Sequence, residues 1–272
     1  YLVAEADESD ASFLCLSPVM AVVTNIDADH MDTYGHDFER LKQAFIDFLQ
    51  RLPFYGRAVL CIDDRHVREI LPFVTRPLTT YGLTPDADVR ADNIRPVAGQ
   101  MLFDVVWQQQ GEEQRHPVTL NLPGRHNVLN ALAAIAAAEH VGVPPATACA
   151  ALADFQNVRR RMELRGTVAG IALYDDFAHH PTAILATLQA LRGKVGGTAR
   201  ILAVLEPRSN TMKMGICKDD LAPSLGRADE VFLLQPQHIP WQVAEVADAC
   251  VQPAHWSADV DALVDMIVKT AH

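Results

Sequence analysis

The stretch RRRMELRGTVAGIALYDDFAHHPT, residues 159–182, determines how the rest of this sequence is interpreted. An apolar, strand-like run at Val168–Tyr174 is followed by Asp175 and Asp176, and Pro181 stands where a helix would begin. Polar side chains at the carboxyl end of a buried strand are typical of ligand sites in open α/β sheets. The three arginines at the start carry planar guanidinium groups that suit phosphate. The stretch therefore predicts a ligand-binding junction between two α/β units.

The composition favours a globular protein that binds neither nucleic acid nor membranes. With 272 residues, 49% of them hydrophobic, the chain is long enough for one large or two ordinary domain cores. The net charge of −11 argues against nucleic-acid binding. Because no apolar run approaches the roughly 20 residues that span a bilayer, and no signal peptide is visible, we expect a cytoplasmic protein without membrane insertion. The five scattered cysteines predict reduced core side chains.

Upstream of the junction, apolar runs alternate with amphipathic segments. Tyr1–Ala4 and Val19–Thr24 each precede a group of acids, which predicts two buried strands of a parallel sheet. Asp37 is placed to cap a helix whose apolar face ends near Leu52. Three later runs predict a small antiparallel sheet: Val89–Ile94, Met101–Trp107 and Val118–Leu122.

Downstream of the junction, strand-like runs again alternate with helical segments. Strands are expected at 200–205, 230–234 and 251–256, with helices between and after them, which is the pattern of a doubly wound domain. The predicted fold class is therefore α/β, with a parallel sheet and a small antiparallel sheet in residues 1–168 and a second α/β domain in residues 169–272. Because the sequence opens inside an apolar run, we expect it to be part of a longer protein.

Two acidic segments are candidate metal sites. Glu5 opens the cluster EADESD at residues 5–10, and His30 stands between Asp29 and Asp32 after the next predicted strand. Carboxylate oxygens are the ligands that Mg²⁺ prefers. The alternative is that the acids are solvated loop residues and that His30 is a structural loop histidine. Since both segments follow neighbouring strands, we expect them to converge.

Other segments are candidate contacts for a nucleotide. Asn127 and Asn130 share one face of a helix start and could read the edge of an adenine ring, although Asn127 could instead cap the helix. Asp176 follows a strand and could accept from a ribose hydroxyl. The arginines at 159–161 could clamp a phosphate or form a solvated charge run. His179 could contact a phosphate or belong to the start of the next helix.

A phosphate loop of the GxxxxGK[ST] kind does not occur in this sequence. Arg208 and Lys213 follow a predicted strand of the second domain, a position that suits the anionic group of a substrate.

Six segments together resemble motifs of the Mur ligase family, in the family's order and across nearly two thirds of the chain. They are EADESDASF (5–13), TNIDADHMDTY (24–34), LPFYGRA (52–58), PGRHNVLNA (123–131), RRRME (159–163) and DDFAHHPT (175–182). Family members are ATP-dependent enzymes that add amino acids or peptides to UDP-N-acetylmuramate. They share a UDP-binding domain, a central ATPase domain and a C-terminal Rossmann-like domain. The resemblance implies an incomplete central ATPase domain at residues 1–168 and most of the Rossmann-like domain at residues 169–272.

The resemblance also implies a mechanism and roles for individual residues. Glu5 and His30 match the residues that hold Mg²⁺, and Arg161 matches the arginine that reaches the ATP phosphates. The implied reaction begins when a substrate carboxylate attacks the γ-phosphate, which gives an acyl phosphate. An incoming amine then displaces phosphate, while Mg²⁺ and cationic side chains stabilise the developing charge.

The remaining implied roles concern the two substrates. The residues that match the nucleotide-binding positions of the family are His126, Asn127, Asn130, Arg161, Asp176 and His179. The residues that are expected to face the carboxylates of the amine substrate are Arg208, Asn210 and Lys213.

The two halves resemble different members of the family. Tyr1 to about Asn130 is similar to members that add L-alanine, whereas the sequence from about Ala133 is similar to members that add the tripeptide L-alanyl-γ-D-glutamyl-meso-diaminopimelate. Because the C-terminal domain contributes most to the choice of amine in this family, the tripeptide is the favoured substrate and L-alanine the alternative. Without the family's phosphate loop, we expect the isolated chain not to catalyse ligation. A non-catalytic nucleotide-binding fragment is the alternative of another class.

Overall fold

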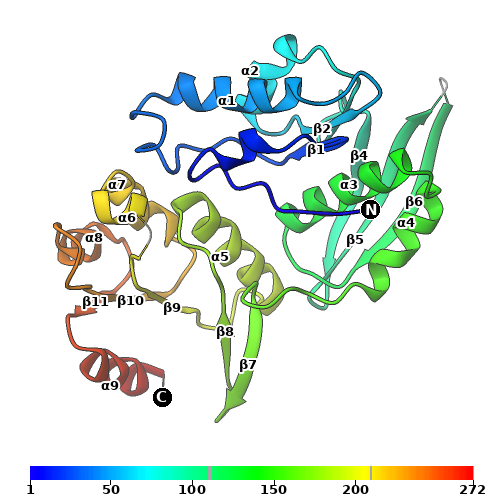
Figure 1. Cartoon of the computed structure of the whole chain (residues 1–272). Coiled ribbons are helices and arrows are strands. Elements are labelled where there is room, and N and C mark those ends of the chain that lie inside the picture. The colour runs from blue at the N-terminus through cyan, green and yellow to red at the C-terminus, as the bar shows by residue number, and fades with distance from the viewer. Residues whose placement is uncertain (110–111, 209, 272) are drawn as a thin grey trace. The chain divides into compact units, whose positions relative to one another are not determined.

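The computed structural model describes residues 1–109, 112–208 and 210–271, and it divides the chain into two compact α/β units, Tyr1–Phe155 and Gln156–His272 (Figure 1). The predicted boundary between residues 168 and 169 lies inside the second unit, at the turn of a strand pair. That residues 168 and 169 separate an ATP-binding part from a C-terminal ligase domain stays a prediction. No helix in the described part of the chain combines the length and apolarity needed to cross a bilayer.

A six-stranded mixed sheet forms the first unit and confirms the predicted fold class. Its strands lie side by side in chain order: β1 (Met20–Val23), β2 (Arg57–Cys61), β3 (Leu78–Gly82), β4 (Val89–Val97), β5 (Gln100–Gln109) and β6 (Glu112–Leu120). The strands from β1 to β4 pair in parallel, and those from β4 to β6 pair antiparallel. The antiparallel strands thus continue the parallel sheet.

Helices cover both faces of the parallel strands. They are α1 (Phe38–Gln50), α2 (Arg65–Ile70), α3 (Arg125–His140) and α4 (Pro145–Ala151), together with the 3₁₀ turns η1 (Ser12–Cys15), η2 (Leu71–Phe73) and η3 (Leu152–Asp154). Neighbouring residues of β2 enter two different cores: Val59 packs in the cluster that contains Leu132 of α3, and Leu60 in the cluster that contains Leu49 of α1. Because both faces of β2 are buried, its residues 58–61 are apolar without alternation.

Carboxylates begin the two helices that follow β1 and β2. Asp37 Oδ1 accepts a hydrogen bond from Glu39 N at 2.9 Å, which confirms the predicted cap of α1. Asp64 Oδ1 caps α2 in the same way and accepts from His66 N at 3.0 Å and Val67 N at 2.8 Å.

The prediction of a strand at Tyr1–Ala4 is wrong. These residues form no strand, and Tyr1, Leu2 and Val3 are almost fully exposed. β1 is the edge strand of the sheet, and within the described residues Tyr1–Ala4 forms no ladder with it. An apolar run becomes a strand only when a neighbouring strand binds its backbone groups, and sequence pattern alone does not show whether that neighbour is present.

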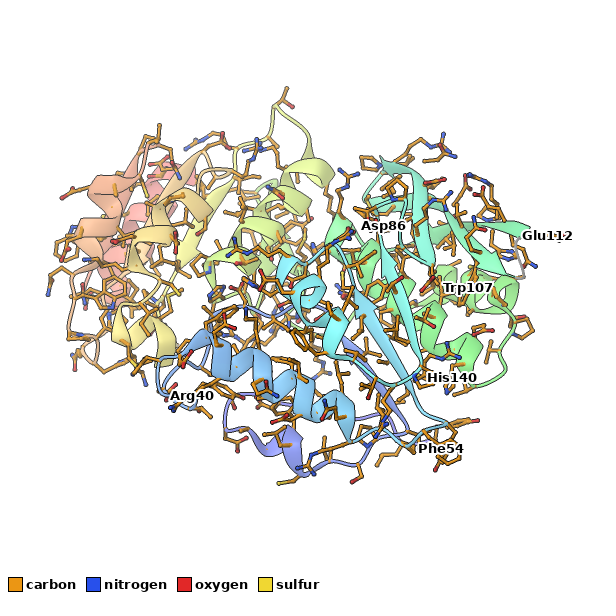
Figure 2. All side chains as sticks on the ribbon, turned by 90° about the horizontal axis from the view of Figure 1, so that it is seen from above. Arg40, Phe54, Asp86, Trp107, Glu112 and His140 are labelled. Atoms are coloured by element: carbon orange, nitrogen blue, oxygen red, sulfur yellow. The ribbon has the colours of Figure 1, made fainter. Side chains whose placement is uncertain are left out.

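The loop LPFYGRA between α1 and β2 carries an exposed aromatic pair. The rings of Phe54 and Tyr55 meet edge to face with centroids 5.2 Å apart, and Phe54 lies at the margin of the unit (Figure 2). Gly56 closes this loop against β1, because a Cβ at that position would lie 2.6 Å from Val19 O.

The second unit combines a strand pair with a small parallel sheet. β7 (Glu163–Val168) and β8 (Ile171–Asp175) pair antiparallel, and β11 (Ala254–Ser257), β10 (Glu230–Leu234) and β9 (Leu202–Leu205) form the parallel sheet in that order. Its helices are α5 (Pro181–Val195), α6 (Asn210–Met214), α7 (Lys218–Ser224), α8 (Val243–Ala249) and α9 (Val260–Ala271). Strands and helices alternate as predicted, apart from the first strand.

The prediction of one buried strand at Val168–Tyr174 is wrong. The chain reverses at Ala169 and Gly170, whose φ angles are 50° and 80°, and the resulting hairpin is largely exposed. The apolar pattern continues through this turn, so periodicity did not reveal the reversal. Gly170 was the available signal, because glycine adopts a positive φ without strain.

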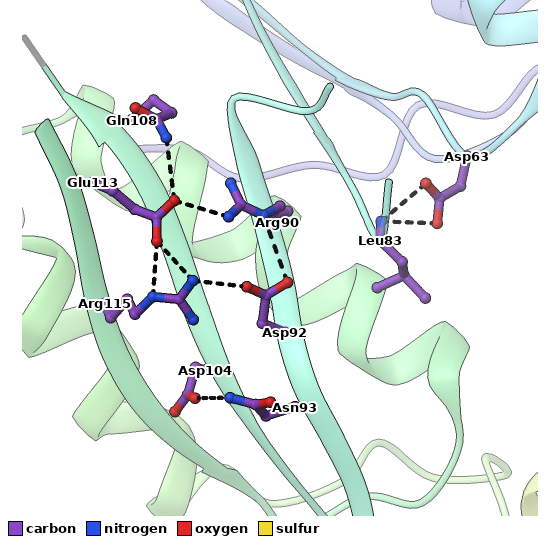
Figure 3. A network of polar contacts seen from close by, with 9 residues as sticks. All are labelled: Asp63, Leu83, Arg90, Asp92, Asn93, Asp104, Gln108, Glu113 and Arg115. Atoms are coloured by element: carbon purple, nitrogen blue, oxygen red, sulfur yellow. Dashed lines mark hydrogen bonds and ion pairs between the residues drawn. The ribbon is translucent and has the colours of Figure 1, made fainter. Parts of the chain in front are cut away.

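A network of ion pairs covers the outward face of β5. Val106 is fully buried although it points away from the core that contains α3. The strand register places four charged residues on the same face as Val106, and Figure 3 shows these four side chains. Arg90 contacts Glu113 at 2.9 Å and Asp92 at 3.5 Å, and Arg115 contacts the same two carboxylates at 2.6 and 3.1 Å. The network therefore shields an apolar side chain as well as pairing charges.

We expect Arg90→Ala to lower the free energy of unfolding by about 1–2 kcal/mol, because it removes two ion pairs from a side chain that is only 14% exposed and opens Val106 to water. Urea unfolding measures this change, and part of it should disappear in 1 M salt. Arg95→Ala, on the same strand but exposed, is the matched control and should stay within about 0.5 kcal/mol of the wild type. Equal effects of the two substitutions would contradict the shielding role.

Candidate nucleotide and metal site

The structure brings the two acidic segments of the first unit together. Tyr34 Oη donates a hydrogen bond to Glu8 O at 2.6 Å, and Thr33 Oγ1 donates to Ser9 O at 2.5 Å. Tyr34 is buried, so this contact fixes the loop after Ala4 against the loop that follows β1. Segments 5–10 and 29–34, which are separate in sequence, thus form one acidic edge.

The pKa of Tyr34 reflects both its burial and the negative charge of this edge. Burial raises the pKa of its phenol to about 12, and the nearby negative charges of Glu8, Asp10 and Asp7 add to the effect. The hydroxyl and the N–H of Ser12 donate to Asp10 and lower the pKa of that carboxyl, so it remains ionised. The edge therefore concentrates negative charge that a divalent cation would neutralise.

The donor chemistry of this edge fits Mg²⁺, which binds carboxylate oxygens. Glu5 is exposed, and His30 lies beside Asp29, which accepts from His30 N at 2.8 Å and approaches His30 Nε2 at 3.7 Å. Among the described residues, no three His, Cys, Asp or Glu side chains are gathered closely enough to hold a metal. Mg²⁺ commonly takes only one or two protein carboxylates together with water and substrate phosphates. The roles of Glu5 and His30 as metal ligands stay predictions.

The adenine-side candidates lie at the start of α3. Gly124, with φ 97°, is the N-cap residue, and no side chain caps this helix. Asn127 Nδ2 donates to Pro123 O at 2.7 Å, so Asn127 braces the preceding turn and is not the cap. His126 is half-buried in the first turn and Asn130 is exposed one turn later. Their contact with adenine stays a prediction.

In the second unit, Asp176 ties the arginine segment to the loop before α5. Its Oδ2 accepts from Met162 N at 2.8 Å, while its Oδ1 accepts from Ala178 N at 2.8 Å and from Thr187 Oγ1 at 3.2 Å. A carboxylate offers about four acceptor positions, so these bonds leave room for a ribose hydroxyl. The predicted ribose contact is therefore compatible with the structural role of Asp176.

Phe177 is a site residue that the sequence patterns missed. Arg161 Cζ lies 5.9 Å from the centre of its ring, and His179 meets the ring edge to face at 5.2 Å. His179 Nδ1 also lies 3.0 Å from Phe177 O. The structure thus brings Arg161 and His179 to one exposed aromatic ring, and Asp176 is the residue directly before that ring in the sequence. The only available signal was an aromatic residue between Asp-Asp and Ala-His-His.

The candidates for the amine substrate follow β9. Arg208 is exposed and pairs with Glu206 at 2.8 Å, and Lys213 is half-buried in the last turn of α6. The side chain of Asn210 lies outside the described residues. The sequence patterns did not predict α6 itself, nor the 3.5 Å approach of Cys217 Sγ to His180 Nε2.

Comparison with known protein families matches both units. Residues 1–138 match the Mur ligase middle domain, and residues 160–272 match the Mur ligase, glutamate ligase domain. The two matches follow one another along the chain and together cover most of it.

Three similar proteins are informative. The UDP-N-acetylmuramate–L-alanine ligase of Laribacter hongkongensis is 72% identical over 224 residues, which are 80% of this chain and 48% of the relative. The UDP-N-acetylmuramate–L-alanyl-γ-D-glutamyl-meso-2,6-diaminoheptandioate ligase of Escherichia coli is 51% identical over 100% of this chain and 59% of its own length. A crystal structure of a murein peptide ligase from Psychrobacter arcticus is 33% identical, with a TM-score of 0.67 over 95% of this chain and 53% of that one. The chain spans about half the length of these relatives.

We expect Tyr34→Phe to lower the free energy of unfolding by about 1 kcal/mol near neutral pH, because it removes the hydrogen bond to Glu8 O. The folded-state pKa of Tyr34 is raised, so its stabilising contribution is complete below about pH 10, where an unfolded tyrosine ionises. That contribution is lost as the pH rises through about 12. Urea unfolding at pH 8 and pH 11 measures this: the wild type should lose part of its free energy of unfolding between the two pH values through Tyr34, and Tyr34→Phe should not lose that part. Tyr55→Phe, at an exposed ring, is the control, and identical pH dependence in both variants would contradict the assignment.

Proposed function

Because this chain belongs to the Mur ligase family, we propose that it carries the nucleotide-binding and amine-selecting parts of an ATP-dependent ligase that acts on UDP-N-acetylmuramate. Members of this family are ATP-dependent ligases, and the relatives named above are ligases. The observation that carries the proposal is the match of one family domain to each compact unit, in the family's order. The contacts of Arg161 and His179 with the Phe177 ring, and the hydrogen bond that links Asp176 to the arginine segment, support it.

For the amine substrate, we propose the tripeptide L-alanyl-γ-D-glutamyl-meso-diaminopimelate, with L-alanine as the alternative. The E. coli relative, whose name states this peptide, matches the whole chain, including the second unit. The more identical L. hongkongensis relative, whose name states L-alanine, matches 80% of the chain. Both substrates carry a carboxylate that Arg208 or Lys213 would pair with, and the tripeptide carries additional ones.

In the proposed reaction, a carboxylate oxygen of UDP-N-acetylmuramate forms a bond to the γ-phosphorus of ATP and ADP leaves. The amine nitrogen then bonds to the acyl carbon, inorganic phosphate leaves, and the nitrogen loses a proton. Arg161 would pair with the terminal phosphate, and Asp176 would accept from the ribose. Glu5 and His30 would hold Mg²⁺, which neutralises phosphate charge when bound.

We expect the isolated chain to bind Mg-ATP weakly and to show no turnover with UDP-N-acetylmuramate and either amine. The reason is that its 272 residues contain no phosphate-loop lysine or metal-binding hydroxyl of the GxxxxGK[ST] kind. Nuclear magnetic resonance titration measures the binding, and a coupled ADP-release assay measures turnover. Sustained ADP release that depends on both substrates would contradict this expectation.

In a continuous polypeptide that joins this chain to the upstream part of the L. hongkongensis relative, we expect kcat/KM to be higher for the tripeptide than for L-alanine. Lys213→Ala should raise the KM for the tripeptide roughly tenfold, because it removes one charge-assisted contact. Lys269→Ala on the exposed side of α9 is the control. Preference for L-alanine would establish the alternative substrate, and an unchanged tripeptide KM would remove Lys213 from the site.

A further inference from the structure

The segment that carries Arg161 is a turn with an uncommon backbone. Arg160 and Met162, the residues on either side, have φ angles of 58° and 46°. This left-handed region is adopted readily by glycine and, less often, by asparagine and aspartate, but seldom by long side chains. Such a conformation persists when the surrounding structure holds it, and it is concentrated at ligand sites.

Two carboxylates hold the N–H groups of this turn. Arg160 N donates to Glu163 Oε2 at 2.9 Å, and Met162 N donates to Asp176 Oδ2 at 2.8 Å. The hydrogen bond from Arg160 N–H, aided by the positive charge of Arg165, lowers the pKa of the Glu163 carboxyl, which is therefore ionised at neutral pH. Hydrogen bonds to ionised acceptors are stronger than neutral ones.

The carbonyl groups of the turn are held as well. Phe177 N donates to Arg160 O at 2.8 Å, and Asn157 Nδ2 donates to Arg161 O. The backbone is thus fixed on both sides of Arg161, while the Arg161 side chain is exposed. Arg160 lies over the Phe177 ring at 4.8 Å and pairs with Asp175 at 3.8 Å, so that cation is directed onto the protein itself.

We propose that Glu163 and Asp176 are positioning residues that hold the left-handed turn at residues 160–162 and thereby present Arg161 to the terminal phosphate of the nucleotide. This inference rests on the proposed function, which assigns that phosphate to Arg161. It adds the reason why a glutamate stands two residues after this arginine. Glu163 acts through the Arg160 backbone and does not itself contact the nucleotide.

The test compares the affinity of the whole chain for Mg-ATP and for Mg-ADP, measured by nuclear magnetic resonance titration, which is suited to weak binding. Only ATP has the terminal phosphate, so the ratio of the two affinities reports on Arg161. We expect the wild type to prefer Mg-ATP and Arg161→Ala to lose about tenfold of that preference. Glu163→Ala should lose the same part of the preference for Mg-ATP and leave the affinity for Mg-ADP unchanged. A general loss of structure would instead weaken the binding of both nucleotides.

Conservative and matched variants sharpen this comparison. Glu163→Gln keeps an oxygen that accepts from Arg160 N and should restore most of the preference. Arg165→Ala removes the 3.1 Å ion pair on the other oxygen of Glu163 without touching the turn, and it should behave as the wild type. Amide hydrogen exchange at Arg160, whose N–H donates to Glu163, gives a readout without nucleotide and should accelerate in Glu163→Ala.

Two substitutions at Met162 test the backbone directly and remain informative if Glu163→Ala does not fold. Met162→Asn suits a positive φ and should keep the Mg-ATP preference, whereas Met162→Val disfavours it and should lose the preference. If Arg161→Ala loses the preference but Glu163→Ala and Met162→Val retain it, the positioning role is overturned and the function of Arg161 stands. If Arg161→Ala changes nothing, or the wild type has no preference, the phosphate role of Arg161 and the inference built on it both fail.

Discussion

Carboxylates that accept hydrogen bonds from backbone N–H groups hold the loops of both units in place. Asp63 binds Leu83 N with both oxygens, at 2.9 and 3.0 Å, across the ends of β2 and β3 (Figure 3). The approach is so close that a Cβ at Gly82 would lie 2.3 Å from Asp63 Oδ1. Asp229 accepts from Ile201 N at 2.7 Å in the second unit. Part of the acidic excess of this chain is therefore structural, because ionised acceptors hold loop N–H groups that no ladder satisfies.

The same interaction explains why structural and ligand-binding acids are hard to separate here. Asp176 lies at the carboxyl end of a strand, as ligand-binding acids do, and it also fastens the turn that carries Arg161. At the other edge, Tyr34 joins two acidic loops by donating to the Glu8 carbonyl, which leaves the Glu8 carboxylate available to a cation. In both places the hydrogen bonds end on backbone groups of the loop, so the side chains of Glu8 and Arg161 can remain directed at solvent or a ligand.

The sheet of the first unit supplies the rigid support for these loops. The strand β2 is buried on both faces, whereas the antiparallel extension has a helical core on one face and ion pairs over Val106 on the other. The two solutions follow from the same need to remove apolar side chains from water. They also explain the sequence, since residues 58–61 of β2 are all apolar, while β5 places Phe103, Val105 and Trp107 in the helical core and Asp104 and Gln108 on the other face beside Val106.

The sequence by itself determined the α/β class, most of the helices and strands, the cap at Asp37 and the family, because periodicity, capping residues and motif order are local properties. The tertiary structure decided the features that depend on contacts between residues far apart in the sequence. Tyr1–Ala4 is not a strand because it pairs with no neighbour in the described chain, and the run at Val168–Tyr174 folds back on β7. It also decided the site around Phe177, since the hydrogen bonds that gather Arg161 and Asp176 join residues that no local pattern connects.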